Sequence, residues 1–143
     1  MEERNIDIHK AAGILIKDRK FLLTHELGKK FYISPGGVIE EGETPQQALV
    51  RELKEEIDLS VNPLDLEYFG TFYAQAAGAE HKFLQMDVYR VLLWSGEIRP
   101  SSGAEVIDDA IWVNTINIPT NIKMGSIFEH EVMPKLKALD LID

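Results

Sequence analysis

The stretch that decides the fold lies at residues 34–59 and reads SPGGVIEEGETPQQALVRELKEEIDL. Its second half predicts a helix with a clear start. Thr44 can serve as the N-cap, Pro45 suits the first helical position and Gln47 can close a capping box. We therefore expect an amphipathic helix that begins at Pro45, because apolar residues recur at helical spacing. They are Ala48, Leu49, Leu53 and Ile57.

Three glutamates accompany the apolar stripe of this helix. At about 100° per residue, Glu52, Glu55 and Glu56 fall beside that stripe on one edge. Like charges at this spacing destabilise a helix by a few tenths of a kcal/mol per pair. A divalent cation would turn the repulsion into coordination, and carboxylate oxygens suit magnesium or manganese. The alternative interpretation is an acidic helix face that is simply solvated.

The loop before the helix is rich in glycine. Gly36, Gly37 and Gly42 allow a tight path and a close approach to a ligand. Such a loop could turn a backbone carbonyl, for example that of Gly37, toward the same metal. A pair of glycines by itself most often marks only a turn. The loop therefore indicates a functional site only in combination with the helix that follows.

The spacing of the loop and helix together resembles the box of the Nudix hydrolase family, the MutT-like pyrophosphohydrolases. That pattern has a glycine, a glutamate, an arginine–glutamate–aliphatic run, a glutamate pair, a glycine and an aliphatic residue. The stretch from Gly37 to Leu59 matches each of these positions at the family spacing except the late glycine, which is Asp58 here. Aspartate tolerates the left-handed conformation better than most residues, so we expect the change to affect only the helix end.

The resemblance implies roles for individual side chains. Glu52, Glu55 and Glu56 correspond to the family's metal ligands and to its catalytic carboxylates, with the carbonyl of Gly37 as a further ligand. In Nudix enzymes a glutamate from the loop before the last strand often joins the metal site or acts as the base. Glu105 is the candidate for that catalytic role, and the neighbouring carboxylates at positions 108 and 109 are its rivals.

The resemblance also implies a structural ion pair between Glu43 and Arg51, which ties the loop to the helix. The residues that would bind the rest of a substrate are harder to choose. Lysines can contact phosphates and aromatic rings can stack on a base, although most lysines are surface residues and most aromatics are core residues. The candidates for substrate binding are Lys29, Lys30, Phe31, Tyr32 and Phe83.

Composition sets limits on the class of protein. A chain of 143 residues with 45% hydrophobic and 27% charged residues predicts one globular domain over residues 1–143. The absence of cysteine excludes disulfides, thiolate metal sites and cysteine nucleophiles. It also argues against the isopentenyl-diphosphate isomerase branch of the Nudix fold, which the resemblance associates with an active cysteine.

Charge and hydropathy limit the partners. The formal net charge is −9 and there is no basic stripe, so we expect no duplex nucleic acid as a partner. The acidic start at residues 1–4 does not resemble a signal peptide, and no apolar run approaches the ~20 residues of a membrane span. We expect a cytoplasmic protein that binds a small nucleotide and no membrane, and we leave open whether it forms a homodimer.

The order of expected elements indicates an α+β domain. Strands are expected over residues 9–16, 21–24, 31–33, 66–75, 82–93 and 110–113. A second helix is expected over residues 122–139, interrupted at Pro134. Strands interleaved with two helices indicate a mixed β-sheet flanked by helices, an α/β/α sandwich, and the Nudix resemblance implies the same fold.

These observations predict an enzyme that uses Mg²⁺ or Mn²⁺ to hydrolyse a diphosphate bond. The substrate would be a nucleoside diphosphate linked to another moiety, such as a nucleoside triphosphate, ADP-ribose or a nucleotide sugar. The metal would neutralise the phosphates and activate water, and a glutamate would take the proton. Two alternatives remain, namely a non-catalytic nucleotide-binding sensor on the same fold and a structural domain stabilised by a metal.

Overall fold

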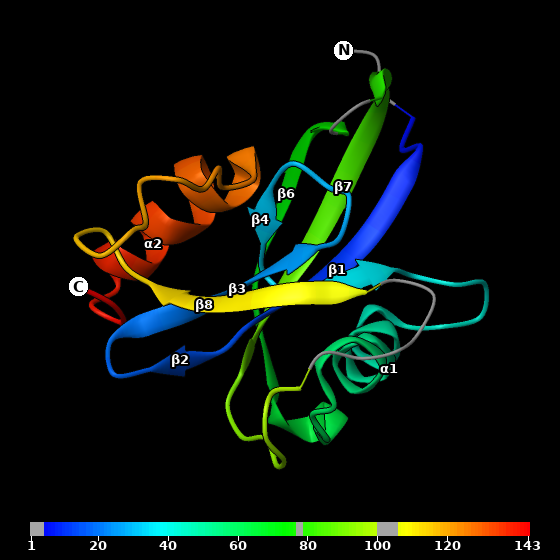
Figure 1. Cartoon of the computed structure of the whole chain (residues 1–143). Helices are drawn as coiled ribbons and strands as arrows, with labels where there is room; N and C mark the ends of the chain where they lie inside the picture. The colour runs from blue at the N-terminus through cyan, green and yellow to red at the C-terminus, as the bar shows by residue number, and fades with distance from the viewer. Residues whose placement is uncertain (1–4, 77–78, 100–105) are drawn as a thin grey trace.

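The computed structural model describes residues 5–76, 79–99 and 106–143, and two β-sheets form its centre (Figure 1). In the first sheet the strand order is β5-β1-β7-β6. β1 pairs parallel with β7 and antiparallel with β5, so this sheet is mixed, as predicted. The strands are β1 (Ile8–Ile14), β5 (Gly36–Val38), β6 (Leu66–Ala76) and β7 (Ala79–Val91).

The second sheet is built around one strand, β3. β2 and β4 pair with one side of β3 and β8 pairs with the other, all of them antiparallel. The turn between β2 and β3 has positive φ at both Asp18 and Arg19, which is the geometry of a tight two-residue hairpin. The strands are β2 (Ile16–Lys17), β3 (Lys20–Glu26), β4 (Tyr32–Ile33) and β8 (Ile107–Val113).

Helices cover the sheets from opposite sides, with α1 (Pro45–Ile57) on one side and α2 (Met133–Ala138) on the other (Figure 1). The core is accordingly split into two clusters of buried residues. Consecutive residues of β1, Ala11 and Ala12, belong to different clusters, so this strand is buried on both faces. This arrangement is the predicted α/β/α sandwich. A short 3-10 helix, η1 (Pro63–Asp65), follows α1.

Helix α1 begins and ends as its sequence predicts. The Gln47 N–H donates to Thr44 Oγ1 at 3.1 Å and the Thr44 N–H donates to Gln47 Oε1 at 2.9 Å, which completes the capping box. Asp58 ends the helix with φ of 59° and ψ of 32°, the left-handed conformation that a glycine would normally adopt here. The aspartate therefore replaces the family glycine without a change in the form of the helix end.

The glycine pair in the loop forms part of strand β5, which is not among the strands expected from the sequence. Gly36 lies so close to β1 that a Cβ there would be 2.0 Å from the carbonyl oxygen of Ala11. No side chain can be accommodated at that distance, so the glycine is needed for the pairing of β5 with β1. The strand thereby holds the start of the loop in a fixed place beside α1.

The C-terminal helix differs from its predicted range of 122–139. Residues 123–125 pair with Tyr32 through Lys123 O and Gly125 N, so helical structure begins only at residue 126. A π-helical segment, η2 (Phe128–Val132), precedes α2, and the N–H of Met133 donates to Phe128 O. The wider turn suits Pro134, which lacks an N–H and would crowd the carbonyl four residues earlier. The predicted interruption is therefore a π-helical segment.

The bounds of several strands also differ from the predictions, among them β3, which extends over Lys20–Glu26, and β7, which extends over Ala79–Val91. β8 begins at Ile107 instead of residue 110, because its first residues pair with the end of β3. The expected strand over 9–16 is divided between β1 and β2, which belong to different sheets. Within the described residues, none of the helices combines the length and apolar character that a membrane crossing requires.

Candidate active site

Two of the three predicted metal ligands are buried on the same face of α1. Glu52 is 8% exposed and Glu56 is 5% exposed, because positions four residues apart share a helix face with the buried stripe. The side chain of Glu55 is 59% exposed. In the described parts of the chain, no three acidic or histidine side chains are gathered closely enough to hold a metal ion. Glu52 and Glu56 are therefore the two predicted ligands that are buried on this face of α1.

Gly37 of β5 lies directly against the Glu52 carboxylate. A Cβ at this glycine would be 2.5 Å from Glu52 Cδ and 2.6 Å from Glu52 Oε1. Any side chain here would displace the carboxylate, so the glycine leaves the space in which Glu52 sits. The loop and the helix thus form one wall, with backbone polar groups of β5 beside a buried carboxylate. Hard cations such as magnesium prefer oxygen donors of these kinds.

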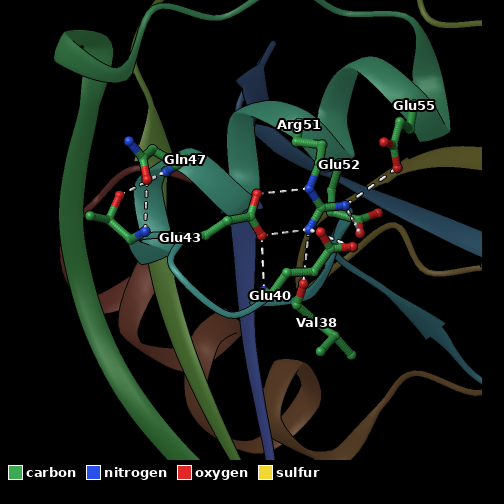
Figure 2. A network of polar contacts seen from close by, with 8 residues as sticks. Val38, Glu40, Glu43, Gln47, Arg51, Glu52 and Glu55 are labelled. Atoms are coloured by element: carbon green, nitrogen blue, oxygen red, sulfur yellow. Dashed lines mark hydrogen bonds and ion pairs between the residues drawn. The ribbon is translucent and has the colours of Figure 1, made fainter.

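Arg51 is the centre of a polar network that joins the loop to the helix (Figure 2). Its Nε and Nη2 donate to the two Glu43 carboxylate oxygens, each at 2.8 Å, so the predicted ion pair is present and bidentate. Nη2 also donates to the carbonyl of Val38 at 3.0 Å. The hydrogen bonds from Arg51 lower the pKa of Glu43 to about 2, and the same contacts raise the pKa of Arg51.

The same arginine also neutralises the glutamates that we expected to repel one another. Arg51 Nη1 lies 2.8 Å from Glu52 Oε1 and 3.4 Å from Glu55 Oε2. Lys54 does not contribute, because its ammonium pairs with Asp58 at 2.9 Å. Sequence reasoning assigned Arg51 only to Glu43 and missed this second role. The i,i+4 spacing of Arg51 and Glu55 was the available signal.

A cavity of about 1150 Å³ extends from this wall across the molecule. Glu56 and Gly37 line it, and so do Lys29, Lys30 and Phe31, three of the predicted substrate-binding residues. Its far wall is formed by residues 124–130, which lead into the C-terminal helix. The volume exceeds that of a typical drug-sized pocket, which leaves room for a nucleotide-sized ligand.

The two remaining aromatic candidates, Tyr32 and Phe83, do not line this cavity. Tyr32 donates its hydroxyl proton to Asp109 Oδ2 at 2.5 Å and stacks on His25 with ring centroids 4.8 Å apart. The hydrogen bond to Asp109 raises the pKa of Tyr32 to about 12. Phe83 stacks on Tyr73 with centroids 5.7 Å apart. Each ring already has an aromatic partner elsewhere in the structure.

The candidate base from the last loop cannot be placed, since Glu105 lies outside the described residues. Its two rivals have other partners and do not line the cavity. Asp108 Oδ1 is 2.6 Å from His25 Nδ1, and Asp109 accepts the Tyr32 hydroxyl proton. These two carboxylates join β8 to β3 and β4, which gives them a structural role.

Sequence reasoning missed several residues that line the cavity. Lys10 of β1 is one of them, and it pairs in register with Val38, next to Gly37. The available signal was a lysine inside a strand that continues with apolar residues and glycine. Thr24 and Glu26 of β3 also line the cavity, as does the segment 124–130. Nothing in the local sequence of that segment indicates that it would face residues of α1.

Comparison with known proteins agrees with this geometry. A family model described as the NUDIX domain matches residues 7–136. The chain belongs to the Nudix family. The Nudix resemblance drawn from the sequence is thereby confirmed, and the protein is an enzyme of the pyrophosphohydrolase type.

Individual relatives of this Nudix protein match most of its length. An 8-oxo-dGTP diphosphatase of Haemophilus influenzae is 37% identical over 110 residues, covering 73% of this chain and 76% of the relative. A protein of the same name from Proteus vulgaris is 28% identical over 102 residues, covering 68% and 87%. The MutT NUDIX hydrolase structure from Burkholderia pseudomallei has a TM-score of 0.70 at 16% identity, covering 95% and 98%. At this low identity, the structural match supports only the assignment of the α/β/α sandwich fold.

Proposed function

We propose that this Nudix enzyme hydrolyses the diphosphate bond of a nucleoside diphosphate linked to another group, with a bound divalent cation. One observation supports this above all others. A single cavity is lined at one end by Gly37 and Glu56 and elsewhere by the lysines of residues 29–30. Because two relatives are named 8-oxo-dGTP diphosphatase, nucleoside triphosphates with a normal or an oxidised base are the first candidate substrates. ADP-ribose and nucleotide sugars are the next.

The residues present fit a hard divalent cation. Glu52 and Glu56 are buried carboxylates one helical turn apart, and Gly37 leaves room for the Glu52 carboxylate beside β5. We propose that these two glutamates and the carbonyl of Gly37 hold Mg²⁺ or Mn²⁺, and that the exposed side chain of Glu55 moves to join them when the cation binds. When bound, the cation supplies positive charge that neutralises phosphate oxygens and acidifies water.

The protein's own groups would bind and orient the substrate. Lys10, Lys29 and Lys30 line the cavity and can neutralise phosphate charge in a molecule whose net charge is −9. Water attacks one phosphorus, the bridging P–O bond breaks, and a carboxylate takes the proton of the water. Glu56 lines the cavity and is our first assignment for this base, with Glu52 and Glu105 as alternatives. Each of the two products retains a phosphate.

A nucleotide panel tests the proposed reaction. The purified protein is incubated with magnesium and with nucleoside triphosphates, 8-oxo-dGTP, ADP-ribose and nucleotide sugars, and the products are identified by mass. We expect cleavage within the diphosphate bridge of at least one compound, and none in excess chelator, with the protein still folded. Full hydrolysis in chelator would remove the metal from the proposal. Binding without turnover would favour the sensor.

Glu56→Gln tests the metal site, with Glu97→Gln as a surface control, since the Glu97 side chain is 84% exposed. Magnesium at a hundredfold excess over its dissociation constant should stabilise the wild type and Glu97→Gln by about 2.7 kcal/mol. Glu56→Gln should gain less and should lose turnover by orders of magnitude. Equal magnesium shifts and normal turnover in all three proteins would show that Glu56 is not a ligand. Magnesium-dependent melting without any turnover would favour a structural metal.

A further inference from the structure

The loop at residues 27–31 forms part of the cavity wall, and the described residues join it to the rest of the protein by the following hydrogen bonds. The Leu27 N–H donates to Val106 O at 2.8 Å, and the Lys29 N–H donates to Glu26 O at 3.0 Å. A third contact comes from a side chain, since the carbonyl of Lys29 lies 2.7 Å from His25 Nε2. The loop residues that line the cavity are Gly28, Lys29, Lys30 and Phe31.

His25 stands between two groups that can only accept hydrogen bonds. Its Nδ1 is 2.6 Å from Asp108 Oδ1, and its Nε2 is 2.7 Å from the Lys29 carbonyl oxygen. A carbonyl has no proton to give, and an ionised carboxylate has none either. A neutral imidazole has a single N–H and could satisfy only one of them. Both contacts together therefore require the imidazolium form of His25.

The charged and titratable groups around the ring favour that form. β8 contributes Asp108 and Asp109, and β4 contributes Tyr32, which stacks on the ring and is itself bonded to Asp109. The nearby ammonium of Lys29 pairs with Glu26 at 3.7 Å. The hydrogen bond with Asp108 raises the pKa of His25 above its ordinary value, and the Lys29 carbonyl and the Asp109 charge act in the same direction.

We propose that His25 is a positioning residue that holds the loop 27–31 in the cavity wall only while its ring has both protons. With one proton left, the ionised Asp108 retains it, because a charge-assisted hydrogen bond is stronger than one to a neutral carbonyl. The lone pair of Nε2 then faces the Lys29 carbonyl oxygen, and the loop loses this tether. The inference rests on the proposed function, because the loop would contact the substrate.

The direction of the pH effect follows from the raised pKa of His25. The imidazolium form of His25 predominates in the folded protein at pH values below 6.5, the ordinary pKa of histidine. This form is lost as the pH rises through the higher pKa that His25 has in the folded protein. We expect KM to increase about tenfold across that range, which is the effect of losing one hydrogen bond to a charged group. The value of kcat should show no step at this midpoint, because Glu52 and Glu56 lie on α1.

An NMR titration tests the protonation without any assay of activity. The chain has four histidines, and loss of one imidazole signal in His25→Gln identifies that of His25. We expect its midpoint to lie above 6.5, and the backbone amides of residues 27–31 to shift with the same midpoint. Asp108→Asn should lower both midpoints together. Loop amides that do not follow the ring, or midpoints that Asp108→Asn leaves unchanged, would overturn the proposal.

Kinetics on the best nucleotide then separate positioning from simple structural support. Asp108→Asn should move the increase in KM to lower pH. His25→Arg has a permanently charged group with several donors and should keep a low KM at all pH values, whereas His25→Gln should have a high KM throughout. His9→Gln is the matched control, because His9 also pairs with an aspartate, Asp87, at 2.5 Å, and it should retain the wild-type KM profile.

A pH step that persists in His25→Arg would contradict the proposal. A wild type that turns over no nucleotide would remove the proposed function instead. The NMR arm would still decide whether His25 controls the loop, so the two failures can be distinguished.

Discussion

Gly37→Ala should reduce catalysis while the fold remains intact. The alanine Cβ would lie 2.5 Å from Glu52 Cδ, whereas ordinary contacts begin at about 3.4 Å, so the carboxylate must move back by about 0.9 Å. Glu52 is the end of a flexible side chain and not backbone, which means that the protein can absorb this movement. The displaced Glu52 would weaken its 2.8 Å contact with Arg51 and leave its place beside β5.

The expected size of the effect follows from that displacement. A misplacement of about 1 Å in a catalytic constellation can reduce the rate about 100-fold, which corresponds to roughly 2.7 kcal/mol in the activation free energy. The apparent affinity for magnesium should fall as well, since Glu52 is a proposed ligand. The melting temperature without metal should change little.

Two neighbouring glycines provide matched controls. A Cβ at Gly42 would meet nothing within 4 Å, although φ there is +82°, so Gly42→Ala should cost about 1 kcal/mol of stability and keep normal turnover per folded molecule. Gly36→Ala would place a Cβ 2.0 Å from a backbone oxygen and should unfold the protein. Rates, magnesium titration by calorimetry and melting curves are measured on all variants. Wild-type turnover and metal affinity in Gly37→Ala would refute the assigned position of Glu52.

Three further predictions concern stability. Arg51→Ala should lower both the melting temperature and the activity, because Glu43 and the buried Glu52 lose their counter-ion; unchanged melting with weaker substrate binding alone would make Arg51 a phosphate ligand. Because the pKa of Glu43 is lowered from 4.5 to about 2, its contribution is present above pH 4.5 and is lost as the pH falls toward 2. Acid titration of unfolding should therefore show a smaller loss over this range in Glu43→Gln than in wild type, and identical curves would contradict the pairing. Ser34→Ala should stabilise the protein by about 1 kcal/mol in chemical denaturation, because the buried Ser34 hydroxyl has no hydrogen-bond partner among the described residues; a loss of stability would reveal a partner.

The parts of the fold that could be predicted depend on local signals. The start of α1 follows from Thr44, Pro45 and Gln47, which interact with one another within a single turn. Its end follows from the tolerance of Asp58 for a left-handed conformation. The burial of Glu52 and Glu56 follows from helical periodicity, and the Glu43–Arg51 pair follows from the family spacing. These features need no knowledge of distant contacts.

The parts that could not be predicted depend on contacts between segments far apart in sequence. β4 and β8 lie on opposite sides of β3, which brings Tyr32 to Asp109 and His25 to Asp108, and the sequence indicated neither contact. Residues 123–125 likewise pair with Tyr32, so the C-terminal helix begins later in the chain than the sequence predicts. Arg51 Nη1 contacts both Glu52 and Glu55, which helical periodicity alone cannot show.

The division of the cavity wall has a consequence for how this enzyme could evolve. Glu56 lies on a helix whose neighbouring positions Leu49, Leu53 and Ile57 are fully buried, so mutations near it affect folding. The opposite part of the wall at residues 28–31 lies outside regular strands and helices, whereas the segment 124–130 contributes Met124, Ile127 and Phe128 to the buried core. Libraries restricted to residues 28–31 should yield variants with new substrate preferences and unaltered melting temperatures. Selection can therefore explore new substrates there while the helix preserves the reaction.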